Sequence, residues 1–148
     1  MDNKRAIDFR LSKDMDCDWV LQSLARFANI GAKTPITLTT GAGLVSGIVI
    51  GGGEYMDLLQ KQVAQAWPEV DSETLDRVFS GWKETYSANK DQEPDENEAK
   101  EEALTLYIHL MDARVLNGGT FVPTSAGVLW RGKIDSIIGF TLGTLSLT

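Results

Sequence analysis

The side chains that could do chemistry in this sequence are its single histidine, its single cysteine and one pair of closely spaced acids. His109 could serve as a general base or a metal ligand, but a metal site requires further nitrogen or sulfur ligands and a catalytic triad requires a nucleophile at a strained turn. Cys17 alone provides neither an intramolecular disulfide nor a thiolate cluster. Glu54 and Asp57 could share a helix face as paired carboxylates, yet the helix dipole also favours acids in a first turn. We therefore predict no catalytic residue, no metal site, no cofactor and no enzyme activity.

A run of three glycines, residues 51–53, could bring backbone N–H groups close to a phosphate at the start of a helix. The run is not followed by the Gly-Lys-Ser/Thr of a phosphate-binding loop, and it lacks the spacing of a dinucleotide-binding fingerprint. We therefore predict that these glycines form a flexible exit from a strand into a helix.

Apolar alternation predicts the strands that would position these residues. Gly41-Ala42-Gly43 separates two of them as a hairpin turn, and Gly118-Gly119 marks a turn near the end of the chain. His109 falls on the strand face opposite Leu106, Ile108 and Leu110. The five predicted strands are residues 36–39, 44–50, 106–110, 128–134 and 137–147.

Helical spacing of apolar residues predicts three helices. The first begins at Asp16 or Asp18, ends before Gly31, and carries the apolar stripe Val20, Leu24, Phe27 and Ala28. The next two would pack as a helical hairpin that is broken by Pro68, with their aromatic stripes expected in the core. Those stripes are Tyr55, Leu58, Leu59, Val63, Ala66 and Trp67 in one helix, and Leu75, Val78, Phe79, Trp82 and Tyr86 in the other.

An acidic segment, residues 91–102, carries most of the negative charge. It holds seven acids and one lysine, which is a net charge of −6 against −7 for the whole chain. It also contains Pro94 and almost no apolar side chain, so we expect a flexible, solvated loop at about residues 88–102. The rest of the chain has no basic cluster that could follow a phosphate backbone, so nucleic acid is an unexpected partner.

The length of 148 residues is that of one ordinary domain, so we predict a single domain, residues 1–148. Within it, residues 54–102 would be a helical insertion that ends in the acidic loop. No apolar run approaches the ~20 residues of a membrane span, and the N-terminal MDNKRAIDFRLSKD lacks the apolar region of a signal peptide. A cytoplasmic protein without a membrane segment is expected.

Two ordered blocks, residues 36–59 and 108–143, resemble the gas vesicle accessory protein U family. In that family an Ile-Thr-Leu strand and a Val-Ser-Gly strand lead to Glu-Tyr, and Ile-His-Leu and Trp-Arg-Gly-Lys-Ile strands follow later. The chain departs from the family in its long helical middle and in ending without a polar, basic tail, so the resemblance implies no role that depends on such a tail. The counterparts here are Val45-Ser46-Gly47, Glu54-Tyr55, Ile108-His109-Leu110 and Trp130-Arg131-Gly132-Lys133-Ile134.

A more distant resemblance is to the Sm-like barrel, in which a helix precedes a bent hairpin and a late hydrophobic-Arg-Gly strand. Residues 51–57 and 130–134 fall where that family keeps its two RNA-contacting motifs. The acid and amide of the first motif would fall on Gly53 and Asp57, and a carboxylate beside phosphates is unfavourable. We use this resemblance for architecture alone, because fold does not fix function.

Together these observations predict an α+β protein: an N-terminal helix, a five-stranded, strongly bent antiparallel sheet or small Sm-like barrel, and an inserted helical hairpin. The resemblance implies a non-enzymatic accessory factor of gas vesicle formation or clustering that binds gas vesicle structural or accessory proteins. An Sm-like RNA-binding module is the alternative.

The interaction residues that we predict are Trp130 and Arg131, with Tyr55 and Asp57. A core position for Trp130 and a surface ion pair for Arg131 are the competing interpretations. The exposed edge of the last strands, residues 134–147, contains no proline and little charge, so a homo-oligomer is expected.

Overall fold

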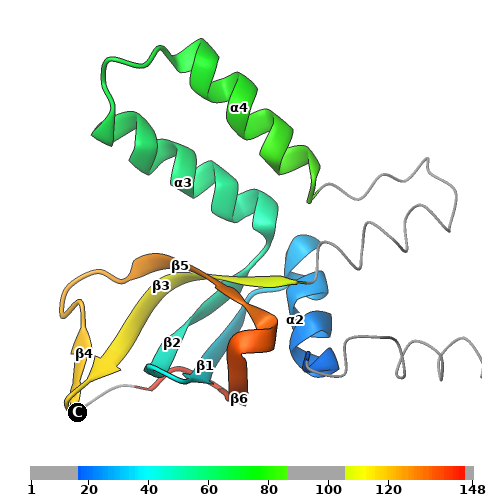
Figure 1. Ribbon diagram of the computed structural model, residues 1–148, viewed down its shortest axis with the longest axis vertical. Coiled ribbons are helices and arrows are strands. Elements are labelled where there is room, and N and C mark those ends of the chain that lie inside the picture. The colour runs from blue at the N-terminus through cyan, green and yellow to red at the C-terminus, as the bar shows by residue number, and fades with distance from the viewer. Residues whose placement is uncertain (1–16, 87–105, 146–148) are drawn as a thin grey trace, which may run out of the picture.

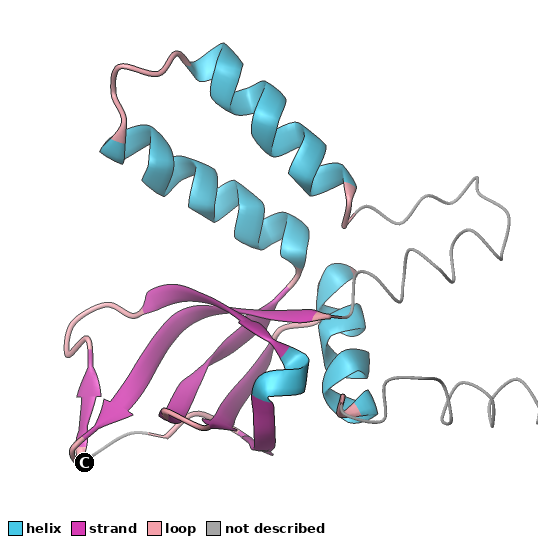
Figure 2. Cartoon of the chain, in the orientation of Figure 1, coloured by secondary structure: helices cyan, strands magenta, loops and turns pink. Residues whose placement is uncertain are grey.

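The computed structural model describes residues 17–86 and 106–145. These residues form an α+β fold in which a helical hairpin, α3 and α4, extends away from a strongly bent antiparallel sheet, and helix α2 lies at one end of that sheet (Figure 1). The helices are α2 (Trp19–Asn29), α3 (Gly52–Ala66), α4 (Ser72–Glu84) and the 3-10 turn η1 (Ile134–Ser136). The strands are β1 (Thr34–Thr40), β2 (Gly43–Ile50), β3 (Tyr107–Asn117), β4 (Thr120–Val122), β5 (Val128–Lys133) and β6 (Ile137–Leu142) (Figure 2).

Strand β3 organises the sheet because it pairs with three others. Its neighbours are β2, β4 and β5, and the order along the sheet is β4-β3-β2-β1-β6. The consecutive strands β5 and β6 are joined by η1, but β5 pairs with β3 whereas β6 pairs with β1. Among the described strands the hydrogen-bond ladder is therefore not closed. Of the two forms that the sequence allows, the protein adopts the open, strongly bent sheet.

The α+β class is confirmed, but the predicted number of strands is wrong. The described sheet has six strands because residues 120–122, which follow the Gly118-Gly119 turn, pair with the end of β3 as the three-residue strand β4. The predicted last strand is also too long. It ends at Leu142, where Gly143 adopts a positive φ of 98°, a conformation that glycine adopts without steric cost.

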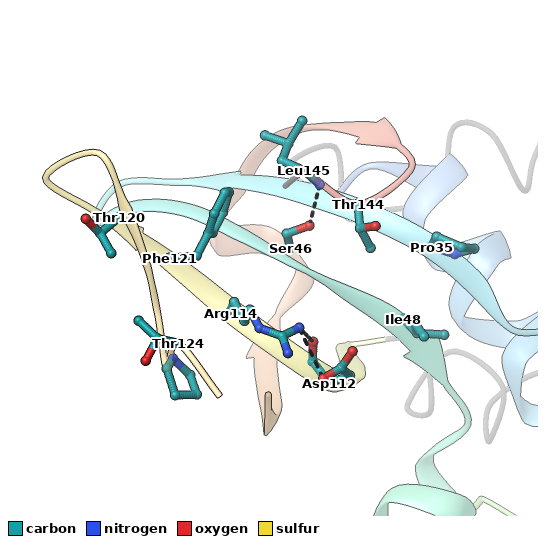
Figure 3. A pocket seen from close by; sticks show the side chains of 11 residues that line it. Pro35, Ser46, Ile48, Asp112, Arg114, Thr120, Phe121, Thr124, Thr144 and Leu145 are labelled. Carbon is teal, nitrogen blue, oxygen red and sulfur yellow. Dashed lines mark hydrogen bonds and ion pairs between the residues drawn. The ribbon is translucent and has the colours of Figure 1, made fainter. Parts of the chain in front are cut away.

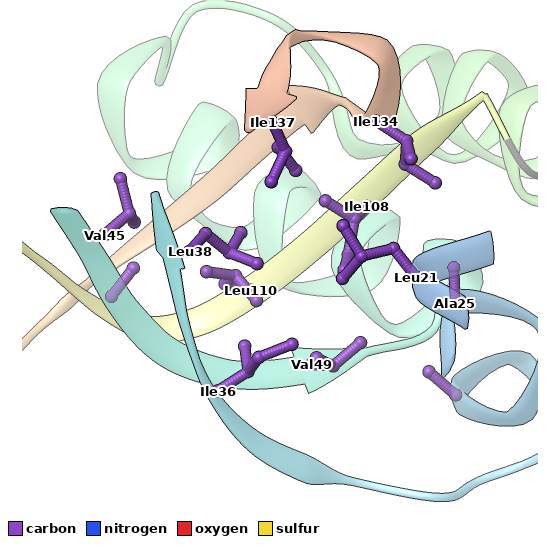
Figure 4. Packing of buried hydrophobic residues seen from close by; sticks show 12 residues of the cluster. Leu21, Ala25, Ile36, Leu38, Val45, Val49, Ile108, Leu110, Ile134 and Ile137 are labelled. Atoms are coloured by element: carbon purple, nitrogen blue, oxygen red, sulfur yellow. The ribbon is translucent and has the colours of Figure 1, made fainter. Parts of the chain in front are cut away.

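The main core lies between α2 and one face of the sheet (Figure 4). Alternation along β1 directs Ile36 and Leu38 into this core, and both are fully buried. A second cluster lies under the helical hairpin and contains Ile50 from β2 together with residues of α3 and α4. The main core consists of Leu21, Ala25, Ala28, Ile36, Leu38, Val45, Val49, Ile108, Leu110, Ala113, Ile134 and Ile137.

Helix α2 begins where the sequence predicts, but the face that it buries coincides only in part with the predicted stripe. The Asp18 carboxylate accepts a hydrogen bond from the backbone N–H of Val20 and caps the helix. Ala28 of the predicted stripe is buried and Leu24 packs against the core, whereas Phe27 is 55% exposed. The buried face is shifted around the helix to include Leu21 and Ala25, and its small alanine side chains let the helix approach the sheet closely.

The helical hairpin also follows the prediction in part. Asp71 caps α4 through the N–H of Thr74, and Leu75 and Phe79 pack on Tyr55 and its neighbours in α3. The predicted core tryptophans Trp67 and Trp82 are instead about half exposed, as is Val78 to a smaller extent. A two-helix layer has one buried side only, so part of each apolar stripe faces solvent.

Two predictions fall outside the described residues: Asp16 as a helix cap, and the acidic loop at about residues 88–102. The described part of the predicted insertion, residues 54–86, contains α4 and all of α3 except its first two residues. Its place between the second and third strands in the chain follows the element order β2-α3-α4-β3.

Candidate interaction site

Tyr55 and Arg131, two of the predicted interaction residues, meet on the sheet face that carries the helical hairpin. Arg131 on β5 lies directly opposite His109 on β3. Since side chains alternate along a strand, His109 points away from the core that Ile108 and Leu110 enter. Helix α3 follows β2 directly, which brings the Tyr55 ring to 4.7 Å from the His109 ring, measured between centroids.

The Arg131 guanidinium is held by side chains from both the sheet and the end of the hairpin. Its Nη1 donates hydrogen bonds to Tyr86 Oη (2.7 Å) and to His109 Nε2 (2.6 Å). Its Cζ lies 4.0 Å from the centroid of the Tyr107 ring, a cation–π contact. Within the described residues, its Nε and Nη2 groups make no hydrogen bond and no carboxylate pairs with it. The guanidinium is therefore fixed in orientation while three of its five N–H groups stay available.

Burial and the neighbouring charge set the protonation of this site. Burial, reinforced by the Arg131 cation, lowers the pKa of His109 from 6.5 to about 3. At neutral pH the imidazole is uncharged, and because its Nε2 accepts from Arg131 its proton resides on Nδ1. Burial also raises the pKa of Tyr55, against the opposing effect of Arg131. Arg131 therefore supplies positive charge next to uncharged aromatic side chains.

An open pocket of about 390 Å³ lies beside this guanidinium, between α3, the end of α4 and β5. Gly52 matters here because a Cβ at that position would collide with the Tyr86 ring, so the glycine permits Tyr86 to lie against the start of α3. The residues that line the pocket are Tyr55, Met56, Leu59, Trp82, Thr85, Tyr86 and Arg131.

The other two predicted interaction residues lie elsewhere. Trp130 precedes Arg131 on β5 and therefore points to the opposite face, where it is half-buried against the main core. Its ring also covers Gly132. Asp57 forms an exposed ion pair with Lys83, whose Nζ lies 2.9 Å from the carboxylate, and this pair links α3 to α4. The structure thus brings together Tyr55 and Arg131 and separates Trp130 and Asp57 from them.

Sequence reasoning missed that His109, Tyr86 and Tyr107 belong to this site. The alternation that placed His109 on the face opposite Leu110 also places Tyr107 with it, so that signal was present in the sequence. The contribution of Tyr86 had no such signal, because it depends on how the hairpin folds back on the sheet.

The buried, neutral histidine predicts a pH-dependent stability. In the unfolded chain His109 titrates near 6.5, but in the folded protein its pKa is about 3, so acid favours the unfolded state. The contribution of neutral His109 to the free energy of unfolding is fully present above pH 6.5 and is lost as the pH decreases toward 3. Between pH 7 and pH 5 we expect a loss of about 1–2 kcal/mol in the free energy of unfolding, measured by urea titration.

His109→Gln is the matched control for this pH dependence. His109 is the only histidine of the chain, and glutamine can still accept a hydrogen bond from Arg131. The variant should lose most of the difference between pH 7 and pH 5. An equally steep pH dependence in the variant would exclude His109 as its source.

A second hollow, of about 460 Å³, lies over the same face of the sheet, further from the hairpin (Figure 3). Ser46 and Ile48 of β2, Arg114 of β3 and Phe121 of β4 line it. In contrast to Arg131, the Arg114 guanidinium is already occupied, because it pairs with Asp112 at 3.2 Å and donates to the Ser125 carbonyl at 2.8 Å. This hollow therefore offers no comparable unpaired cation.

A chain of buried hydroxyls holds the residues after β6 against this face. The Leu145 N–H donates to Ser46 Oγ (2.9 Å), and Thr37 Oγ1 donates to the Gly143 carbonyl (2.9 Å). Since the Thr37 proton is used in that way, Ser46 donates to Thr37 across 3.2 Å. The chain is satisfied from end to end, which favours a structural role for these hydroxyls.

The described residues contain no group of three or more His, Cys, Asp or Glu side chains that could hold a metal ion. Among the helices of residues 17–86 and 106–145, none combines the length and hydropathy needed to cross a membrane.

The fold and the site define an α+β protein with an open antiparallel sheet and an arginine-centred aromatic pocket under an inserted helical hairpin. The chain belongs to the family described as Gas vesicle protein GvpU-like, which matches residues 18–145. This match covers most of the chain and confirms the family resemblance, so the protein is a member of a gas vesicle-related family. No curated protein and no solved structure matches the chain.

Proposed function

We propose that this protein is a non-enzymatic accessory factor of gas vesicle formation or clustering that acts in the cytoplasm by binding gas vesicle structural or accessory proteins. The observation that carries the proposal is the family match over residues 18–145, which spans nearly the whole described fold. The exposed Arg131 beside half-exposed aromatic side chains adds support, because arginine and aromatic residues are enriched among the residues that dominate protein interfaces.

Co-flotation with intact gas vesicles tests the proposal. The purified chain should rise with the vesicles, and Arg131→Glu should weaken that association by at least ~1 kcal/mol if this pocket reaches the interface. Arg77→Glu is a matched control, because Arg77 is an exposed arginine on α4 that does not line the pocket. Trp130→Ala is a poorer probe, because Trp130 packs on the main core and its loss would also reduce stability.

The alternative, an Sm-like RNA-binding module, is tested in parallel by titrating oligo-uridine at low salt. Absent co-flotation together with micromolar or tighter RNA binding would overturn the accessory-protein proposal in favour of this alternative. Asp57 argues against RNA, because it places a carboxylate where the Sm-like motif has an amide; in the structure this carboxylate pairs with Lys83.

We further propose that the chain forms homo-oligomers through β6. Within the described sheet β6 pairs with β1 alone, and Ile138 and Leu142 on it are 75% and 68% exposed. An unpaired strand with exposed apolar side chains favours association with another edge. Light scattering should show an oligomer, and the double variant Ile138→Lys with Leu142→Lys should shift it to the monomer. A wild-type monomer at high concentration would refute this proposal.

A further inference from the structure

We propose that the pocket beside Arg131 binds a carboxylate side chain, Asp or Glu, that is flanked by apolar residues in a partner protein. The inference rests on the proposed function, since it names the chemistry of the partner segment that the accessory protein would recognise.

Charge is the first reason. The Arg131 cation lies against aromatic side chains, of which His109 is neutral at pH 7 and Tyr55 has a pKa raised by burial. Within the described residues no carboxylate pairs with it, whereas Arg114 pairs with Asp112 and Lys83 with Asp57. An anion of the partner would complete this site with a charge-assisted contact.

Orientation is the second reason. The contacts of Nη1 with Tyr86 and His109 and the stacking on Tyr107 leave the Nε and Nη2 side of the guanidinium without a hydrogen bond in the described part of the chain. Nε and Nη2 form the edge of a guanidinium that can bind both oxygens of one carboxylate. The entropy of fixing this long side chain is already lost before the partner arrives, so less is lost on binding.

The lining of the pocket decides between kinds of anion. Met56, Leu59 and Trp82 give it apolar walls, which suit the flanking side chains of a peptide. A dianionic phosphate would bring two charges to one guanidinium, whereas a carboxylate matches that single charge. The carboxylate of a peptide is therefore the ligand that fits both the charge and the walls.

Two synthetic peptides that differ only in charge test the inference. Acetyl-Gly-Leu-Glu-Leu-Gly-amide and its Gln counterpart are titrated into the full-length chain, and the arginine Nε–Hε signals are followed by NMR. The Glu peptide should bind at least ~10-fold more tightly and shift the Arg131 signal, because a hydrogen bond to a charged group contributes more than a neutral one.

Arg131→Lys is the informative variant, because it keeps the positive charge but removes the guanidinium edge, Nε and Nη2, that could bind both oxygens of a carboxylate. It should reduce the preference for Glu over Gln, because lysine keeps the charge but cannot bind both carboxylate oxygens in the plane of a guanidinium, whereas Arg77→Lys should leave the preference unchanged. Thermal unfolding of both variants checks that they fold. Tyr86→Phe provides a second test, because it leaves Arg131 in place but removes the hydroxyl that accepts from Nη1. Its preference for Glu should be reduced, because Arg131 loses one of the contacts that orient it.

Equal binding of the two peptides, or an undiminished preference in Arg131→Lys, would overturn the inference. Tighter binding of oligo-uridine than of the Glu peptide at the same pocket would do the same. These failures are separable from failure of the proposed function. A chain that co-floats with vesicles but does not prefer the Glu peptide refutes the carboxylate pocket alone, whereas a chain that does not co-float refutes the accessory function.

Discussion

Replacing Leu21 with alanine is expected to lower the free energy of unfolding by about 2–5 kcal/mol. Leu21 is fully buried where α2 packs on the sheet, within the cluster that contains Ile108 and Leu110. Removing three carbon atoms there loses their transfer free energy and leaves a cavity, because the strands around it cannot collapse fully into the space. Urea unfolding followed by circular dichroism measures the change.

Phe27→Ala is the control for Leu21→Ala. The sequence pattern favours Phe27 as a core residue, but its side chain is 55% exposed, so its truncation should cost only about 1 kcal/mol or less. If Phe27→Ala destabilised the protein more than Leu21→Ala, α2 would dock through the stripe that the sequence predicts, and the packing described for the main core would be wrong.

Replacing Gly51 with alanine is expected to destabilise the protein by about 1–3 kcal/mol. A Cβ at Gly51 would lie 2.7 Å from the Ala28 carbonyl oxygen and 3.0 Å from Asn29 Cα, both backbone atoms at the end of α2. Backbone at a helix end cannot rotate away as a side chain can. The substitution must therefore separate α2 from the junction of β2 and α3, where Asn29 Oδ1 also accepts the Gly52 N–H at 3.0 Å.

Gly53→Ala is the matched control within the same glycine run. A Cβ there would be 3.8 Å from the nearest atom, Lys83 Cγ, which is ordinary contact. Because alanine is the better helix former, this variant should keep its stability or gain up to ~1 kcal/mol. Equal effects of the two substitutions in thermal unfolding would show that the run acts through flexibility alone, as the sequence suggested, and not through close packing at Gly51.

Local patterns in the sequence were sufficient for most of the secondary structure. Alternation and glycine turns predicted β1, β2, β3 and β5, and the cap at Asp18 is one of the two that the sequence offered. These features depend on residues within a few positions of one another, so they can be recognised without knowing the fold. Strand β4 was missed because three residues are too few to show a period.

The family followed from sequence as well, since the two resembling blocks lie inside the matched range of residues 18–145. The choice of Arg131 and Tyr55 as interaction residues also came from those blocks. The positions of the side chains in space did not follow from the sequence. Trp130 adjoins Arg131 in sequence but lies on the other face of β5, and Asp57 pairs with Lys83.

By itself, therefore, the sequence determined most of the helices and strands, which family the chain resembles and that His109 lies opposite the core face of its strand. Only the tertiary structure decided which stripe of α2 is buried, that Gly51 is required for space, and that Arg131 joins His109 and Tyr86, 22 and 45 residues away. The physical reason is the distance along the chain over which each interaction acts. Hydrophobic period, capping and turn preference act over a few residues, whereas the register of β5 on β3 and the return of α4 toward the sheet arise from packing between distant segments.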